Sequence, residues 1–197
     1  MTRENKVIEK KDLIPEDEYA KNRKDIRQKL VQFKKKRRME IGPYATFYFE
    51  SFETMLAQIQ EMLHIEKGGD NQLKDELSAY NPLVPKGNEL VATLMFEIDN
   101  PNQRTIFLNK IGGIENKIYI HINKEKIKAT PETDVDRTSA EGKASSVQFL
   151  HFKFNDNQAN MFKDVKNKII LSIEHDLYSH STKLSDDTRN ALIKDFT

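Results

Sequence analysis

The chain contains no cysteine and no tryptophan among its 197 residues. Without cysteine it can form no disulfide, hold no iron–sulfur cluster through thiolates and carry out no thiol catalysis. No apolar run approaches the ~20 residues of a transmembrane helix, and the opening MTRENKVIEKKD lacks the apolar segment of a secretory signal. We therefore expect a cytoplasmic protein with no membrane segment.

Charged residues are abundant and unevenly distributed. They make up 32% of the chain, against 37% apolar residues, so we expect a modest core and a heavily charged surface. Residues 21–38 hold ten bases and one acid, whereas residues 50–99 hold three bases and ten acids. Such a separation favours a basic helix lying against an acidic surface of the same fold, or alternatively an external anionic partner.

Periodicity and turn residues predict helices and strands in a mixed order. We expect helices over about 12–38, 52–67, 70–81, 103–111, 159–165 and 186–196, with Asp12, Ser51 and Ser185 as N-caps and a capping box at Asn155–Gln158. We expect strands over 39–41, 45–50, 90–98, 118–122, 127–129, 147–154 and 168–175. The polar stretch 130–145 is the predicted loop or lid. Neighbouring strands without intervening helices indicate an α+β fold, a mostly antiparallel sheet flanked by helices with an N-terminal helix and hairpin. A flexible segment 1–11 would precede a single domain, 12–197.

Four acids stand inside otherwise apolar segments and form, with two arginines, the candidate polar pocket: Glu50, Glu61, Glu66, Glu97, Arg37 and Arg38. A buried carboxylate is costly unless it is paired or hydrogen-bonded. These acids therefore either anchor the basic helix through ion pairs or line a polar pocket. Because helix geometry points Glu61 and Glu66 about 140° apart, only one of them can meet that helix. We expect Glu61 to pair with Arg37 or Arg38.

Two arrangements of histidines could bind iron or zinc. Glu61 and His64 share one helix face at i, i+3 spacing, as in ferritin-like di-iron proteins, but the motif occurs only once. His121, His151 and His175 lie on three predicted strands, where they could join Glu97 or Glu174 in a metal site. The alternative is a set of separate histidines, because the strand register decides whether they meet.

The run Lys34–Arg38 could bind phosphates, which makes a nucleic-acid binder acting through helix 21–38 a further alternative. Aromatic residues do not interleave with these bases, and a basic helix end is also favoured by the helix dipole. We therefore do not expect nucleic acid to be the main partner.

Several segments of the chain resemble a bacterial family catalogued as domain of unknown function 3501. They are Gly42-Pro43, Phe49-Glu50, Gln58–Leu63, Ile65-Glu66 and Tyr80–Pro85. The resemblance implies a fold but carries over no catalytic residues. It differs at two places: members commonly have arginine where this chain has His64, and His-Pro where Asp176-Leu177 precedes Tyr178.

The resemblance also implies an association with rubrerythrin-like and iron–sulfur oxidoreductase proteins. The leading hypothesis is therefore an accessory or binding protein that acts with such a redox partner, without catalysis or a cofactor of its own. A metal-dependent enzyme that uses the histidines and glutamates is the main alternative.

Overall fold

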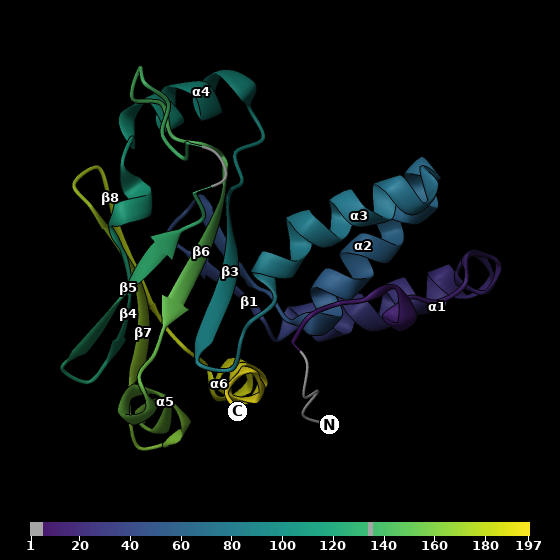
Figure 1. Ribbon diagram of the computed structural model, residues 1–197. Helices are drawn as coiled ribbons and strands as arrows, with labels where there is room; N and C mark the ends of the chain where they lie inside the picture. Colours follow the sequence, from purple (N-terminus) through teal and green to yellow (C-terminus); the bar gives the residue numbers. More distant parts are fainter. Residues whose placement is uncertain (1–5, 134–135) are drawn as a thin grey trace.

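The computed structural model describes residues 6–133 and 136–197 and has an α+β fold, as predicted (Figure 1). The strands are β1 (Arg38–Ile41), β2 (Ala45–Phe49), β3 (Glu89–Phe96), β4 (Ile118–Ile122), β5 (Glu125–Pro131), β6 (Val147–Lys153), β7 (Ile169–His175) and β8 (Tyr178–Lys183). The helices are α1 (Glu16–Lys35), α2 (Phe52–Glu66), α3 (Gly69–Tyr80), α4 (Pro101–Lys110), α5 (Asp156–Lys163) and α6 (Asp186–Leu192). The strands form one sheet in the order β1-β2-β3-β6-β5-β4-β7-β8, with antiparallel neighbours.

The sheet is curled so strongly that its two edge strands, β1 and β8, come into contact. Tyr178 on β8 donates its hydroxyl hydrogen to the carbonyl of Ile41 at 2.6 Å, and the same oxygen accepts from the backbone N–H groups of Tyr44 and Ala45 at 3.1 and 3.0 Å. Thr182 adds a bond from its hydroxyl to the carbonyl of Glu40 at 2.8 Å. Side chains of β8 thus join the two edges.

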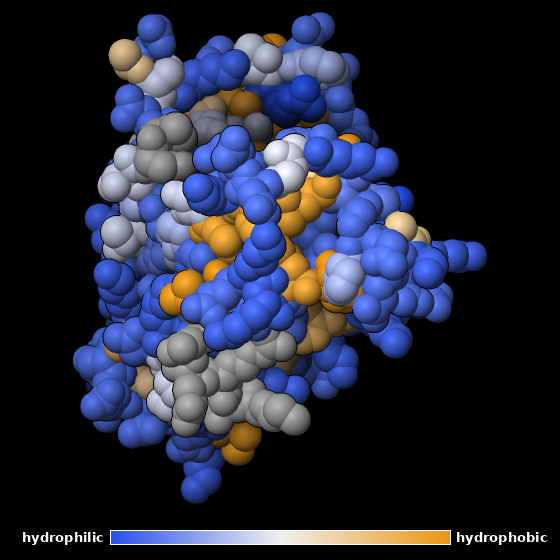
Figure 2. All heavy atoms as spheres, turned by 45° about the vertical axis from the view of Figure 1, so that its right-hand side comes forward, coloured by the Kyte–Doolittle hydropathy of each residue, from blue (hydrophilic) through white to orange (hydrophobic). Residues whose placement is uncertain are grey.

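Alternation along the strands produces two apolar clusters, one on each face of the sheet. The enclosed face carries the larger cluster, to which β3 contributes Leu90, Ala92, Leu94 and Phe96. On the opposite face, Val91 packs with Met55 and Ile59 of α2 and with Leu73 of α3. Figure 1 shows α4 at one end of the sheet, α5 and α6 at the other, and α1–α3 grouped on one side. Figure 2 shows hydrophobic side chains in the middle of the face that carries these three helices, surrounded by hydrophilic ones.

Several helix starts have the predicted capping residues. Ser51 and Thr54 form a capping box at α2, Asn155 and Gln158 form one at α5, and Ser185 caps α6. The residue that ends α2 in a left-handed conformation is Lys67, at φ 54°, rather than either of the glycines that follow it.

The N-terminal region differs from the prediction. Asp12 does not cap α1: it lies in a short 3₁₀ helix, Lys10–Asp12, and α1 begins only after Pro15. Residues 1–5 of the predicted flexible segment lie outside the described residues. Within the rest of it, Ile8 is buried, and Asn81 hydrogen-bonds to both its N–H and its carbonyl. This part of the segment packs on the body of the protein.

Two further differences concern β8 and the predicted loop. The strand β8 was not predicted, because its residues YSHSTK alternate without a second apolar side chain to mark a buried face. The predicted loop 130–145 begins later, since β5 continues to Pro131, and it contains a bridge between Thr138 and Ala144. Residues 134–135 of this stretch lie outside the described residues.

We predict that Tyr178→Phe lowers the free energy of unfolding by about 1–3 kcal/mol. The change keeps the ring but leaves the buried carbonyl of Ile41 and the N–H of Ala45 without their partner. Tyr44→Phe is the matched control, because Tyr44 is 39% exposed. Denaturant unfolding curves would give the comparison; equal losses in the two variants would contradict the role of the Tyr178 hydroxyl.

Candidate functional site

Arg37 lies buried where α1 leads into β1 and joins three parts of the fold. Its guanidinium donates to the backbone carbonyls of Phe49 at 2.9 Å, Glu50 at 2.7 Å and Ala191 at 3.0 Å. It also forms an ion pair with the Asp195 carboxylate. The Arg37 side chain is only 3% exposed, so this pair is shielded from solvent.

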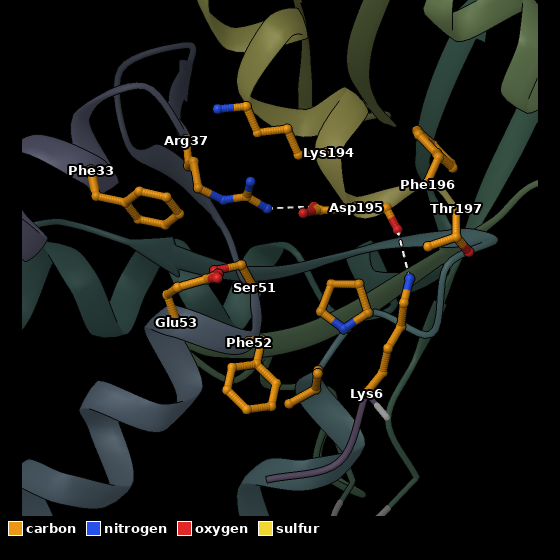
Figure 3. Close-up of a pocket in the computed structure, with 12 residues that line it drawn as sticks. Lys6, Phe33, Arg37, Ser51, Phe52, Glu53, Lys194, Asp195, Phe196 and Thr197 are labelled. Atoms are coloured by element: carbon orange, nitrogen blue, oxygen red, sulfur yellow. Dashed lines mark hydrogen bonds and ion pairs between the residues drawn. The ribbon is translucent and has the colours of Figure 1, made fainter. Parts of the chain in front are cut away.

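Next to this ion pair lies a cavity of about 570 Å³, here named the Arg37 pocket. Its lining comes from the N-terminal segment, α1 and the turn after it, the start of α2, the segment before β3 and the end of the chain: Lys6, Phe33, Arg37, Ser51, Phe52, Glu53, Val84, Pro85, Lys194, Asp195, Phe196 and Thr197. Figure 3 shows Arg37 and Asp195 directed toward each other, with Phe33, Phe52 and Phe196 around them.

Burial shifts the protonation equilibria of two groups in the Arg37 pocket. It raises the pKa of Asp195 from an ordinary 3.8 to about 6, although Arg37 opposes this shift. It also lowers the pKa of Lys6, against the attraction of Asp195 and Glu89. The Lys6 ammonium donates to the backbone carbonyl of Asp195 at 3.2 Å. Groups shifted in this way inside a cavity are typical of functional sites, although structural ion pairs produce the same effect.

The predicted pairing of Glu61 with Arg37 or Arg38 is wrong. Glu61 accepts two hydrogen bonds from Arg23, one of them at 3.1 Å from Nε, and a third from the Tyr19 hydroxyl at 2.7 Å. These hydrogen bonds lower the pKa of Glu61 to about 2, and the contribution of Arg23 is the largest. Glu61 therefore does anchor α1 to α2, but near the middle of α1 and not at its end.

The other three acids lie in separate places, so the six predicted residues do not form one pocket. Glu50 is buried and accepts from the hydroxyls of Thr54 and Thr93 at 2.6 and 2.7 Å. Glu97 is exposed and accepts from Thr46 and Tyr48, with Arg38 at 3.7 Å. Glu66, predicted to be buried, is exposed and accepts from Gln72 at 3.0 Å. Glu66 is the last residue of α2, at the end of the helix that extends away from the sheet in Figure 1.

Each candidate metal-binding histidine has its own neighbours. His64 contacts Glu16 at 2.7 Å, His121 contacts Ser172 and Glu174 at 2.8 and 3.0 Å, and His175 lies 3.3 Å from the carbonyl of Gly112. The strand β5 separates β6, which carries His151, from β4, which carries His121. Within residues 6–133 and 136–197, no three histidine or acidic side chains are arranged to share a metal ion.

His151 lies between two carboxylates on the outer face of the sheet. Its Nδ1 is 3.0 Å from Glu89 and its Nε2 is 2.6 Å from Glu132. Carboxylates only accept, so both bonds form together only when the imidazole carries two protons. Burial, the largest single effect, disfavours this charge, but the two glutamates outweigh it and raise the pKa of His151.

The arginines and the lysines of residues 21–38 differ in whether they form ion pairs. All four arginines pair with acids of the same chain: Arg23 and Arg27 with Glu61, Arg37 with Asp195, and Arg38 with Glu40 and Glu97. Among the described residues, no acid lies within ion-pair distance of the six lysines, which are Lys21, Lys24, Lys29, Lys34, Lys35 and Lys36. The expected match between the basic segment and the acidic residues 50–99 therefore holds for Arg23, Arg27 and Arg38, whereas Arg37 pairs with Asp195 near the other end of the sequence.

An apolar groove of about 370 Å³ runs between α1 and α2. Most of its lining is apolar, and the base Lys29 and the acids Asp12 and Glu53 also belong to it; the full set is Asp12, Ile14, Tyr19, Ile26, Lys29, Leu30, Phe33, Glu53, Leu56, Ala57 and Gln60. Tyr19 is the one buried residue that α1 contributes over its twenty residues. Phe33 and Glu53 line both this groove and the Arg37 pocket, so the two hollows are adjacent.

Sequence reasoning missed Lys6, Glu89, Glu132 and Asp195 as site residues. The signal for Asp195 was available, since it stands between Ile193 and Phe196 just as Glu50 directly follows an aromatic strand. Glu89 and Glu132 gave no such signal, because their proximity to His151 depends on the pairing of β3, β6 and β5.

A family model described as protein of unknown function, DUF3501, matches residues 7–196. The chain belongs to this family. A crystal structure of a novel protein of unknown function from Burkholderia pseudomallei K96243 has the same fold, with a TM-score of 0.89 and 31% sequence identity. The match covers 97% of this chain and 100% of that one. No curated protein matches the chain.

None of the described helices combines the length and hydrophobicity required to cross a bilayer.

We predict that Asp195→Asn gains stability relative to the wild-type protein as the pH rises from 4 to 7. The folded-state pKa of about 6 lies above the ordinary 3.8. The protonated acid therefore stabilises the fold at low pH, and this contribution is lost as the pH rises through 6. Two pKa units correspond to about 3 kcal/mol. Denaturant unfolding across this range, with the exposed Asp75→Asn as control, would measure the change; a difference that does not vary with pH would refute it.

We predict that His151 titrates above the ordinary 6.5, and that Glu132→Gln lowers its pKa. Because the folded-state value is raised, the stabilisation is complete below 6.5 and is lost as the pH rises through the folded-state pKa. NMR titration of the His151 ring would show the shift. The exposed Glu125→Gln is the control, and an unchanged His151 titration in Glu132→Gln would contradict the bridging geometry.

Proposed function

We propose that this protein is a binding protein that docks an acidic, amphipathic segment of a partner protein along α1. The observation that carries the proposal is the combination, on one helix, of an apolar groove against α2 and five lysines, Lys21, Lys24, Lys29, Lys34 and Lys35, that have no acid within ion-pair distance in the described part of the chain. A helix whose apolar side enters the groove and whose acidic side faces the lysines would match both features. The resulting function is accessory rather than catalytic.

The arginines of this region are paired with acids and the lysines are not, and this difference favours a protein partner over a nucleic acid. Arginine is the residue best suited to planar recognition of phosphates and bases, yet the arginines of this region are occupied by Glu61, Asp195, Glu40 and Glu97. Apolar side chains such as Leu30 and Leu56 add nothing to phosphate binding, but they suit the hydrophobic face of a peptide helix. Lys29 lines the groove, and together with the other lysines of α1 it would attract an acidic partner to this helix.

The family resemblance implies a rubrerythrin-like or iron–sulfur redox protein as the partner. The docking surface itself requires only an acidic amphipathic segment. Such a redox protein is therefore the first natural partner to test once binding of a model peptide has been measured.

We predict that a helical peptide with a glutamate face and a leucine face binds saturably at low salt. Lys29→Glu and Leu30→Asp should each weaken binding by about tenfold, the first by charge repulsion and the second by loss of the apolar contact. The exposed Lys74→Glu on α3 is the matched control. Fluorescence anisotropy with labelled peptide would give the affinities.

Three outcomes would contradict the proposal. One is the absence of saturable peptide binding at low salt. Another is binding that is insensitive to both groove variants. The third is tighter binding of an oligonucleotide or of anionic lipid vesicles with the same sensitivity to Lys29→Glu, which would assign α1 to nucleic acid or to a membrane surface instead.

A further inference from the structure

We propose that a second hollow between α1 and α2 binds inorganic phosphate. This hollow, here named the His64 hollow, has a volume of about 430 Å³ and is lined by Ala20, Arg23, Lys24, Arg27 and His64. It shares no lining residue with the apolar groove or with the Arg37 pocket. The inference is therefore independent of the docking of a partner along α1.

The His64 hollow lies over one face of α1. Its four residues from this helix follow one another at intervals of three, one and three positions, which places them on the same side: Ala20, Arg23, Lys24 and Arg27. Ala20 is the small member of this set, and its methyl group leaves the space between the longer side chains open. His64 bounds the hollow from α2, where its ring makes a T-shaped contact with the ring of Tyr19.

The lining carries more positive charge than the neighbouring acids neutralise. Its residues from α1 contribute three positive charges, and none of the lining residues is acidic. The acids that contact the lining among the described residues are Glu61, which binds Arg23, and Glu16, which binds His64. One positive charge therefore remains when His64 is neutral, and two remain when it is protonated. A phosphate dianion would neutralise the second state.

Three of the lining side chains have polar atoms available for a ligand. Lys24 is exposed and has no acid within ion-pair distance in the described part of the chain. Arg27 lies 3.8 Å from Glu61, too far for a hydrogen bond, and its side chain is 59% exposed. His64 uses Nδ1 for the contact with Glu16 at 2.7 Å, so Nε2 is the ring nitrogen left for a ligand. Two charge-assisted bonds and one imidazole suit a tetrahedral oxyanion.

The tautomer of His64 selects inorganic phosphate among such anions. A carboxylate only accepts, so Nδ1 carries a hydrogen for Glu16 and the neutral ring presents Nε2 as an acceptor. Inorganic phosphate keeps a hydroxyl group at about pH 8 and can donate it to Nε2, while its other oxygens accept from Lys24 and Arg27. Sulfate and the dianion of a phosphate monoester have no hydroxyl on the anionic group, so they would set an oxygen lone pair against Nε2.

The groups around the His64 ring leave it as the one that changes charge near neutral pH. They are Glu16, Tyr19 and the three bases of the lining from α1, and Glu61 from α2 itself. Of these types of side chain, only histidine titrates between about pH 6 and 8. The preference for inorganic phosphate should therefore be present at about pH 8 and disappear at about pH 6, where the protonated ring donates to any of these anions.

The test compares three anions at about 150 mM salt, a concentration that screens unspecific attraction to the surface. At about pH 8 we expect inorganic phosphate to bind saturably at millimolar concentration, and sulfate and glycerol 3-phosphate to bind about tenfold more weakly. Calorimetry would give the affinities, and NMR shifts of the His64 ring would locate the binding.

Variants separate a built site from general charge attraction. Ala20→Leu would fill the hollow without changing any charge, and we expect it to weaken phosphate binding about tenfold. Arg27→Gln should act in the same direction, while α1 keeps its attachment because Tyr19 and Arg23 still bind Glu61. His64→Phe keeps a ring against Tyr19 and should abolish the preference over sulfate. Lys74→Gln on α3 is the surface control.

The inference is overturned if inorganic phosphate does not bind saturably, if Ala20→Leu and Arg27→Gln both bind it like the wild-type protein, or if sulfate binds equally well at about pH 8. Tighter binding of glycerol 3-phosphate than of inorganic phosphate would replace it with a site for a phosphorylated organic molecule. Peptide affinity along α1 should be the same in Ala20→Leu as in the wild-type protein, so the two proposals can fail separately.

Discussion

The fold depends on one buried guanidinium. Arg37 follows α1 in the chain. Its side chain binds the end of β2 and the C-terminal segment through three carbonyls and one carboxylate. A planar group with five donors in fixed directions can satisfy several acceptors from different elements at once, which a lysine ammonium cannot do with the same geometry. The cost of burying its charge is offset in part by these three carbonyls and in part by the Asp195 carboxylate beside it. The Arg37 pocket exists because these elements meet around a polar junction and not around a packed apolar one.

The same chemical difference organises the basic region as a whole. Arginines hold α1 to the rest of the protein, while the lysines between them remain hydrated and unpaired among the described residues. One amphipathic helix therefore serves two purposes, attachment on one side and presentation of charge on the other. Tyr19 and Arg23 attach it through a single acid of α2, Glu61. This narrow attachment leaves most of α1 accessible to a partner.

Local signals in the sequence were sufficient for most elements and insufficient for the site. Ser51, Asn155 and Ser185 mark their helix starts because capping depends on three or four neighbouring residues. The strand β8 escaped prediction because its position at an edge places little apolar surface in the core. The partner of Glu61 could not be deduced, since the angle at which α1 crosses α2 decides whether Arg23 or Arg37 reaches it. The contacts of His151 likewise follow from strand register, which no local pattern specifies.

The Arg37 and Asp195 pair also has a consequence for how the chain acquires its structure. The two residues are separated by 158 positions. During synthesis the arginine is therefore made well before its carboxylate partner. The junction of α1, β1 and β2 therefore cannot bury its cation at a low energetic cost until the C-terminal segment has arrived. Contacts this distant in sequence are slow to form because a long loop must close first. Until they form, the first hairpin is expected to stay open to solvent, a period in which a chaperone could engage it.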